Sequence, residues 1–411
     1  MVTGVKRDGA GRGTGAPDAR AVVILGSTGS VGRSTLDVVR ALRGRFVVAG
    51  LSAFRSAGEL ASQVAEFRPA VAVLAGEVPA EEASSLAGAC RAAGTRLLAG
   101  PSGLLEAARL GQAEMVVNAL VGSAGIEPTL AAIEAGKHLA LANKESLVAA
   151  GGLIVKAASR AGVRLMPVDS EHSAIHQCVR GEDAGRIRRI VLTASGGPLV
   201  DVTGDRLAGV SAEEALSHPT WNMGRKVTID SATLVNKGFE VIEAHWLFGV
   251  EADRIEVLVE RKSVVHSLVE FVDGSVSALL SPPDMRLPIQ YALTYPERVA
   301  TPFARLDLTS MSSVVFERPD HDRFPCLALA YQALAKGGTT PAVLSAADEV
   351  AVAAFLDGRI GFGDIHWMLS EVTARHRPVA AESLEAVLEA DRWARQAAEA
   401  MVAARATEAG A

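Results

Sequence analysis

The chain has 411 residues, of which 49% are hydrophobic and 21% are charged, a balance that supports large buried cores and excludes disorder throughout. A net charge of −6 excludes an overall basic field for nucleic acid or an anionic membrane, so phosphate recognition must be local. No uncharged apolar run approaches the roughly 20 residues that span a bilayer. We therefore expect two or three packed domains, with no nucleic-acid or membrane partner.

The start of the chain and the cysteines indicate in which cellular compartment the protein is expected. The apolar stretch 21–25 is short and runs into a glycine-rich turn, unlike the hydrophobic region of a secretory signal. Cys90, Cys178 and Cys326 are odd in number and widely spaced, which indicates neither a disulfide framework nor a zinc site. A reducing cytoplasm is expected. Residues 1–20 have no apolar period, and we expect a disordered extension.

The pattern of apolar segments predicts an α/β fold in three parts. Residues 21–168 alternate short apolar segments with helical spacing, which is typical of a Rossmann-like, doubly wound parallel sheet. Residues 169–306 mix strands and helices and predict a catalytic and dimerisation domain whose sheet is partly antiparallel. A linker at 307–325 leads to a C-terminal helical bundle at 326–411. The expected strands are AVVIL, FVVAGLS, VAVLA, EMVVNAL, HLALA, VRLMPV, RIVLTAS, RIEVLVE, SVVHSLVEF and SVSALLS.

The first chemical motif is GSTGSVG, where a strand ends at Gly26, Gly29 and Gly32 follow, and a helix begins at once. Glycines let the backbone approach a pyrophosphate, whose charge then lies at the helix N-terminus. The alternative is an ordinary strand-to-helix turn, since the spacing is GxxGxxG and not GxGxxG. After the next strand, Arg55 and Ser56 stand where an NAD-binding fold usually has a carboxylate, which favours NADPH over NADH. A solvated Arg55 is the alternative.

Two further strands of the expected parallel sheet end in polar residues. Asn143, Lys144 and Glu145 follow one strand and are expected to face the ligand crevice, with helix capping as the alternative. Asp169 and Glu171 follow another. Two residues apart in an extended segment, they point the same way and suit a hard divalent cation, whereas acids at a helix start are the alternative.

A helix expected to begin near Ser231 places Asn236 and Lys237 one turn before Glu240, so that an amide, a cation and an acid share a face. A solvated surface face is the alternative. Ser195, followed by two glycines, offers a hydroxyl and flexible amides of the kind that bind phosphate.

The segment 217–225 contains Pro219 and Gly224, which disfavour a continuous helix, and we expect a mobile lid. In that interpretation His218 hydrogen-bonds the substrate, Trp221 covers its carbon backbone and Met223 packs near the nicotinamide. A buried Trp that anchors an ordinary turn is the alternative.

Taken together, these segments resemble the 1-deoxy-D-xylulose 5-phosphate reductoisomerase family over residues 21 to about 375. The similar motifs, in order, are GSTGSVG, LANKES, PVDSEHSAIHQ, TASGGP and HPTWNMGRKVTIDSATLVNKGFEVIEAHWLF. The resemblance implies a homodimer that uses NADPH and Mg²⁺ or Mn²⁺ to isomerise and reduce a small sugar phosphate, 1-deoxy-D-xylulose 5-phosphate, to 2-C-methyl-D-erythritol 4-phosphate in isoprenoid synthesis.

The resemblance also implies roles for matching residues. Asp169, Glu171 and Glu240 would hold the metal. The cofactor would contact Thr28, Gly29, Ser30, Val31, Asn143, Glu145 and Gly224. The substrate would be surrounded by Lys144, Ser170, Ser195, His218, Ser231, Asn236 and Lys237, with Ser195, Ser231, Asn236 and Lys237 nearest its phosphate.

Two segments depart from the family pattern: Phe54-Arg55-Ser56, which bears on 2′-phosphate binding, and Glu260-Arg261-Lys262-Ser263, which bears on the dimer edge. Two other classes of protein share the glycine-rich turn. A semialdehyde or homoserine-type dehydrogenase would not need two separated acidic motifs and a serine-rich phosphate site, and a semialdehyde enzyme would need a nucleophilic Cys. A nucleotide-sensing binding protein would have no use for Asp169, Glu171 and Glu240.

Overall fold

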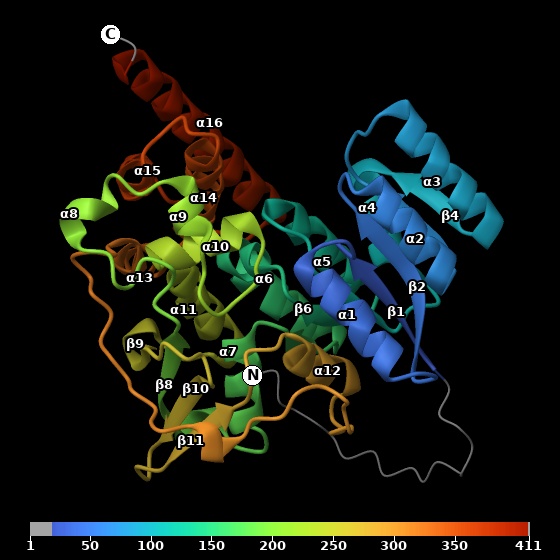
Figure 1. The fold of residues 1–411 in the computed structure, drawn as a ribbon, viewed down its shortest axis with the longest axis horizontal. Helices are drawn as coiled ribbons and strands as arrows, with labels where there is room; N and C mark the ends of the chain where they lie inside the picture. Colours follow the sequence, from blue (N-terminus) through green and yellow to red (C-terminus); the bar gives the residue numbers. More distant parts are fainter. Residues whose placement is uncertain (1–18, 410–411) are drawn as a thin grey trace. The chain divides into compact units, whose positions relative to one another are not determined.

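The computed structural model describes residues 19–409, which form two compact units (Figure 1). The first contains the described residues up to 143 together with 154–173 and 284–303, and the second contains 144–153, 174–283 and the described residues from 304 onward. Residues 1–18 of the expected N-terminal extension lie outside the described residues. Arg20, the last residue of that expected extension, already belongs to a strand.

The first unit is built on a parallel sheet of seven strands in the order β4-β3-β2-β1-β5-β6-β7. The six strands expected here are all present. The sequence did not predict β4, an edge strand of four residues that is partly exposed and therefore lacks a continuous apolar run. The bounds are β1 (Arg20–Leu25), β2 (Phe46–Ala53), β3 (Val71–Leu74), β4 (Arg96–Ala99), β5 (Met115–Asn118), β6 (His138–Leu141) and β7 (Leu165–Pro167).

The strand order reverses between β1 and β5, which are neighbours in the sheet although three strands separate them in sequence. In open α/β sheets, ligands bind outside the carboxyl ends of the strands at such a switch point. The glycine-rich turn after Leu25 lies at this end of β1. The doubly wound fold expected from the sequence is confirmed.

The helices of the first unit are α1 (Ser30–Ala41), α2 (Ala57–Phe67), α3 (Ala80–Ala93), α4 (Gly100–Ala108), α5 (Ile126–Glu134) and α12 (Arg286–Thr294). Residues of α1, α2, α3 and α12 share one hydrophobic core with the sheet. The helix α12 belongs here because Ile289, Tyr291 and Leu293 are buried in the same core as α1 and β1. The functional domain boundaries expected at 168, 306 and 325 remain a prediction, and the compact units are cut differently. Two helices continue from one unit into the other, α6 (Lys144–Ala161) and α7 (Ser170–Cys178).

The second unit contains a four-stranded sheet in the order β11-β10-β8-β9. β8 and β9 are parallel and the other pairs are antiparallel, as expected for a partly antiparallel sheet. The strands are β8 (Ile187–Ala194), β9 (Ile255–Val259), β10 (Val265–Phe271) and β11 (Val276–Leu280).

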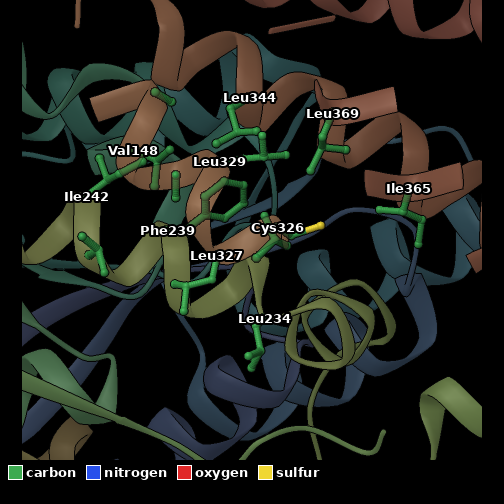
Figure 2. Close-up of a cluster of buried hydrophobic side chains, with 14 of the residues drawn as sticks. Val148, Leu234, Phe239, Ile242, Cys326, Leu327, Leu329, Leu344, Ile365 and Leu369 are labelled. Carbon is green, nitrogen blue, oxygen red and sulfur yellow. The ribbon is translucent and has the colours of Figure 1, made fainter. Parts of the chain in front are cut away.

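The helices of the second unit share one core with this sheet. They are α8 (Gly204–Leu207), α9 (Ala212–Leu216), α10 (Arg225–Thr233), α11 (Val235–Phe248), α13 (Cys326–Lys336), α14 (Thr340–Leu356), α15 (Phe362–Arg375) and α16 (Leu384–Ala409). Short 3-10 turns of the chain lie at Ser123–Gly125, Ala184–Arg186, Ala252–Arg254 and Leu308–Ser310. Figure 2 shows Phe239 of α11 among Leu329 of α13 and Leu344 of α14. The expected C-terminal helices are therefore present, and they are packed onto the helix that carries candidate site residues.

The single helix expected from near Ser231 is wrong in its bounds. α10 already begins at Arg225, and Leu234 interrupts the helix in the left-handed conformation, with φ +60°. A residue with a Cβ adopts this region at a cost, and here Leu234 is buried with 3% exposure in the core. Asn236 and Lys237 therefore lie in the first turn of a new helix. Among residues 19–409, the longest apolar helical stretches fall short of what crossing a membrane requires.

The glycine-rich turn is packed too closely for side chains at two of its three glycines. A Cβ on Gly32 would lie 2.2 Å from the carbonyl oxygen of Gly26, and one on Gly26 would lie 2.4 Å from the carbonyl oxygen of Ala119. Gly29 has an ordinary φ of −77°, and its nearest neighbouring atom would be 3.4 Å away. The third glycine is therefore required for the approach of α1 to the turn.

We expect Gly32→Ala to destabilise the chain by about 1–3 kcal/mol, because the added methyl group meets backbone that cannot move aside. Gly29→Ala is the matched control, and it should melt close to the unaltered chain. Thermal denaturation followed by circular dichroism measures both. Equal melting temperatures for the two variants would show that this close approach does not constrain the turn.

Candidate active site

The glycine-rich turn of the first unit leads directly into a helix N-terminus. Thr28 and Gly29 precede α1, Ser30 and Val31 begin it, and the helix has neither a side-chain cap nor an acid in its first turn. The turn is fixed from behind, since the Ser52 hydroxyl accepts from the amide of Gly26 at 2.8 Å and the Ser27 hydroxyl donates to Gln63 at 2.6 Å. A rigid, uncapped helix N-terminus is a site for an anion.

The loop after β2 presents the other expected cofactor groups. Phe54, Arg55 and Ser56 are all exposed, and the Arg55 guanidinium lies 4.9 Å from the centre of the Phe54 ring. Ser56 immediately precedes α2 without capping it. The guanidinium is therefore held beside the carboxyl end of β2, on an aromatic support.

Asn143 is 1% exposed, and its side-chain amide donates to the carbonyl oxygens of Leu120 at 3.1 Å and Gly122 at 2.9 Å. These bonds hold the loop after β5 against the end of β6. The amide nitrogen of Asn143 thus has a structural role in the first unit, and its contact with a cofactor remains a prediction.

The acidic pair of the first unit does not lie in an extended segment, which corrects the geometry expected for it. Asp169 follows β7, and Ser170 already begins α7, so that Glu171 lies in the first helical turn. A carboxylate oxygen of Asp169 and one of Glu171 nevertheless lie within 4.8 Å of each other. The Ser170 hydroxyl donates to Glu171. The helix start brings the two acids together as effectively as a strand would.

Glu240 is the centre of a buried cluster in the second unit. Its side chain is 2% exposed and accepts from the Asn236 amide at 2.7 Å and from the Lys237 ammonium. Lys144, at the start of α6, lies 3.5 Å from Glu240 and 3.1 Å from Glu243. The solvated face considered for this helix is therefore wrong, because Lys237 and Glu243 are each 4% exposed.

Close packing of α6 on α11 positions Lys144. α6 is kinked at Ala150, and the two glycines that follow face the indole of Trp246. A Cβ on Gly151 would lie 2.2 Å from that ring, and one on Gly152 would lie 3.2 Å from it. The glycines allow α6 to approach α11 closely enough for its first residue to reach Glu243.

His218 and Ser195 form a directed hydrogen-bond chain. The Nδ1 atom of His218 accepts from the backbone amides of Thr220 and Trp221 at 3.1 and 3.0 Å, so the ring proton must be on Nε2. Nε2 lies 3.0 Å from the Ser195 hydroxyl, which also accepts from the Gly197 amide at 3.2 Å. With two donors directed at its oxygen, the Ser195 hydroxyl keeps its own proton to donate elsewhere.

The segment 217–224 is a loop, as expected, and it leads directly into α10 with Gly224 at the N-cap. Trp221 and Met223 are half-buried, and the Trp221 ring meets the ring of His266 edge-on at 6.3 Å. The turn after Ser195 approaches α10, because a Cβ on Gly197 would lie 2.4 Å from the carbonyl oxygen of Ser231. Ser195 and Ser231 are thus brought to the same region of the second unit.

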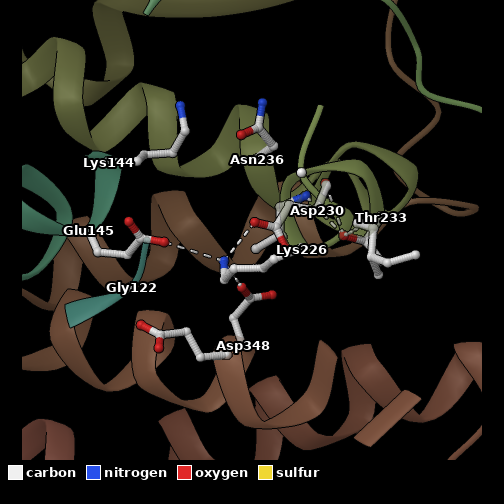
Figure 3. Close-up of polar contacts among 12 residues, drawn as sticks. Gly122, Lys144, Glu145, Lys226, Asp230, Thr233, Asn236 and Asp348 are labelled. Carbon is white, nitrogen blue, oxygen red and sulfur yellow. Dashed lines mark hydrogen bonds and ion pairs between the residues drawn. The ribbon is translucent and has the colours of Figure 1, made fainter. Parts of the chain in front are cut away.

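Sequence reasoning missed a second charged cluster, centred on Lys226 (Figure 3). Lys226 contacts Asp230 at 2.6 Å, Asp348 at 2.7 Å and Glu145 at 3.6 Å. The spacing of Lys226 and Asp230, one helical turn apart, could have indicated an ion pair between them. Asp348 was a second signal, since it is the one charged residue among the buried positions of α14, most of which are apolar.

Comparison with known proteins gives a consistent family. Family models described as 1-deoxy-D-xylulose 5-phosphate reductoisomerase, its C-terminal domain and the DXP reductoisomerase C-terminal domain match residues 22–151, 165–248 and 280–397. A 1-deoxy-D-xylulose 5-phosphate reductoisomerase from Synechococcus is 52% identical over 92% of this chain and 96% of its own length. The enzyme of that name from Symbiobacterium thermophilum is 53% identical over 92% and 98%.

Solved structures agree over the same length. The 1-deoxy-D-xylulose 5-phosphate reductoisomerase from Zymomonas mobilis in complex with NADPH is 43% identical, with a TM-score of 0.86, and the match covers 93% of this chain and 99% of that one. A DOX-P reductoisomerase in complex with NADPH, fosmidomycin and magnesium is 39% identical, with a TM-score of 0.86 and coverage of 93% and 98%.

The tautomer of His218 has a consequence for pH. Burial lowers the pKa of this imidazole, because the charged form is disfavoured away from water. A neutral ring is therefore maintained above the ordinary pKa of about 6.5, and the two loop bonds at Nδ1 are lost as the pH falls below that value toward the lowered pKa.

We expect ¹⁵N-histidine spectra to show His218 as the Nε2–H tautomer, titrating below pH 6.5, with His218→Asn identifying its signals. In that variant the Asn oxygen can replace Nδ1 as the acceptor of the loop amides, so the loop should stay ordered at low pH. Finding the proton on Nδ1 at neutral pH would contradict this arrangement.

Proposed function

As the chain belongs to the 1-deoxy-D-xylulose 5-phosphate reductoisomerase family, we propose that it converts 1-deoxy-D-xylulose 5-phosphate and NADPH to 2-C-methyl-D-erythritol 4-phosphate in the non-mevalonate isoprenoid pathway. The observation that carries this proposal is the start of α11. There Lys237 and Glu240 are buried and the half-buried Asn236 amide donates to Glu240, so that one cation, one acid and one amide meet, which is the combination that a metal-chelated sugar phosphate requires.

The cofactor site that we propose begins at Thr28, Gly29, Ser30 and Val31, where the uncapped start of α1 suits a pyrophosphate. Exposed Arg55 and Ser56 at the end of β2 would receive the 2′-phosphate of NADPH. Asn143, Glu145, Met223 and Gly224 would complete the site. A solved relative holds NADPH, which supports the same cofactor here.

The metal ligands that we propose are Asp169, Glu171 and Glu240. The facing carboxylate oxygens of Asp169 and Glu171 are hard ligands of the kind that Mg²⁺ and Mn²⁺ take, and magnesium is present in a solved relative. A bound cation would polarise the substrate carbonyl and neutralise the oxygen that gains charge. Lys144, which lies beside Glu240 and Glu243, would hydrogen-bond a substrate oxygen.

The substrate phosphate would be bound by Ser195, Ser231, Asn236 and Lys237, with Ser170, His218 and Trp221 around the rest of the molecule. The neutral His218 supports this assignment, because it leaves the Ser195 hydroxyl as a donor, and a phosphate oxygen accepts. The loop 217–224 would close over the substrate and exclude water from hydride transfer.

We further propose a homodimer in the cytoplasm. β11 is an edge strand of its sheet, and its outward Val276 and Leu280 are 56% and 39% exposed, so a second copy would cover them. Glu260, where the chain departs from the family pattern, is buried. Its carboxylate accepts from the amides of Lys262, Val264 and Val265 and so fixes the loop before β10. Three free cysteines are in keeping with a reducing compartment.

Oxidation of NADPH by the purified chain, followed at 340 nm, tests the function. We expect turnover that requires both 1-deoxy-D-xylulose 5-phosphate and a divalent cation, stops with a chelator and returns with excess Mg²⁺ or Mn²⁺. Absence of substrate-dependent turnover with metal present would refute the proposal.

Glu240→Gln should lower turnover by roughly 100-fold or more, because losing a ligand costs at least as much as losing a residue that supports one. Glu243→Gln is the comparison variant on the same helix, since it also contacts Lys144 and is itself a possible metal ligand outside the proposed set. Its turnover should fall less, and its metal affinity should not change. The ligand set is wrong if both variants require the same metal concentration.

Trp221→Ala should melt like the unaltered chain while the KM for substrate rises and kcat falls, because a lid residue acts only on the closed complex. Trp246→Ala is the contrasting variant, since that indole packs on Gly151 and the core, and its loss should cost roughly 3–5 kcal/mol of stability. A large fall in the melting temperature of Trp221→Ala, with unchanged kinetics, would reject the lid.

A further inference from the structure

Lys226 is surrounded by acids from three different helices of the second unit (Figure 3). Its ammonium lies 2.6 Å from Asp230, one turn further along α10, and 2.7 Å from Asp348 in the middle of α14. The third acid, Glu145, is in the first turn of α6, 3.6 Å away. The side chain of Lys226 is 14% exposed, and its ammonium also faces the Phe239 ring at 5.5 Å.

The charges of this cluster do not balance if every acid is ionised. Asp230 and Asp348 are 2% and 0% exposed, and one carboxylate oxygen of each receives no hydrogen bond from the described residues. Burial, and then the charge of the other carboxylate, raises the pKa of Asp230, and burial also raises the pKa of Asp348. Both shifts favour protonation of one of the two acids, which lowers the negative charge around Lys226.

The cluster connects parts of the site that the reaction requires in fixed positions. Glu145 and Gly224 are proposed cofactor residues, and Lys226 lies two residues after Gly224 in the same helical start. Lys226 therefore ties the end of the loop 217–224 to the start of α6. Asp348 comes from α14, more than a hundred residues further along the chain, and none of the cofactor or substrate residues proposed above lies on that helix.

We propose that Asp348 and Lys226 are positioning residues for the nicotinamide cofactor: Asp348 fixes the ammonium of Lys226, and Lys226 fixes Glu145 and the N-terminus of α10. This inference rests on the proposed function for the role of Glu145. It gives the C-terminal helices a part in cofactor binding, although none of the cofactor residues proposed above lies on them.

Two variants of Asp348 separate positioning from folding. Asp348→Ala removes the acceptor of Lys226, and the dissociation constant for NADPH and its KM should each rise about tenfold, the scale of one charge-assisted hydrogen bond. At saturating NADPH, kcat should fall much less. Asp348→Asn keeps an oxygen acceptor and is neutral like a protonated acid. Its dissociation constant for NADPH should therefore stay within about twofold of that of the unaltered chain, in contrast to the rise in Asp348→Ala.

Val352→Ala is the control for general loosening of α14, because it removes buried methyl groups one turn away and leaves the charged cluster intact. It should lower the melting temperature without raising the dissociation constant for NADPH. Lys226→Met combined with Asp348→Ala should weaken NADPH binding no more than Lys226→Met alone, since both changes break one chain of contacts.

NADPH binding is measured directly by nucleotide fluorescence, independently of turnover. An unchanged dissociation constant in Asp348→Ala, or an equal rise in Val352→Ala, would overturn the positioning role. Failure of the unaltered chain to reduce 1-deoxy-D-xylulose 5-phosphate would instead refute the proposed function, so the two failures are distinguishable.

Discussion

Burying a charged side chain costs several kcal/mol unless a partner of opposite sign replaces the lost water, and α10 and α11 bury both Asp230 and Glu240. Each is matched by a cation of its own helix, Lys226 and Lys237. The remaining balance comes from elsewhere, with Lys144 from α6 and the second acid of the Lys226 cluster from α14. The arrangement of helices in the second unit is thus constrained by electrostatic pairing as well as by apolar packing.

The sequence predicted the strands that are buried in the sheets, because their apolar runs are continuous or alternate clearly, and it predicted the loop at 217–224 from proline and glycine. β4 was not predictable from local pattern, since an edge strand needs little apolar surface. The break at Leu234 was hidden for another reason: a buried leucine held at positive φ by its surroundings leaves no sign in the sequence. Asp169 and Glu171 were expected in an extended segment, yet a helix start brings the same two oxygens together.

In the candidate site, too, some contacts could be predicted from local sequence pattern and others could not. Spacing alone placed Asn236, Lys237 and Glu240 on one face, because helical geometry fixes neighbours three and four residues apart. Contacts between distant segments could not be read in this way. The bond between Ser195 and His218 depends on a turn and a loop, and the bond between Lys226 and Asp348 joins helices more than a hundred residues apart. The resemblance to a family indicated Ser195 and His218 as site residues, but it did not indicate Lys226 and Asp348.

The turn after β1 and the candidate groups of the second unit are built by different means, and this affects what substitutions can do. In the first unit the turn after β1 presents backbone amides at the start of α1, and its geometry depends on glycines that touch backbone. In the second unit the candidate groups are side chains, and most are fixed by another side chain, as Glu240 is by Asn236 and Lys237. A backbone site is lost only when the turn deforms, whereas a side-chain site can change one contact at a time. Specificity for the substrate is therefore expected to reside in the second unit, where single replacements alter charge or hydrogen bonding without disturbing the fold.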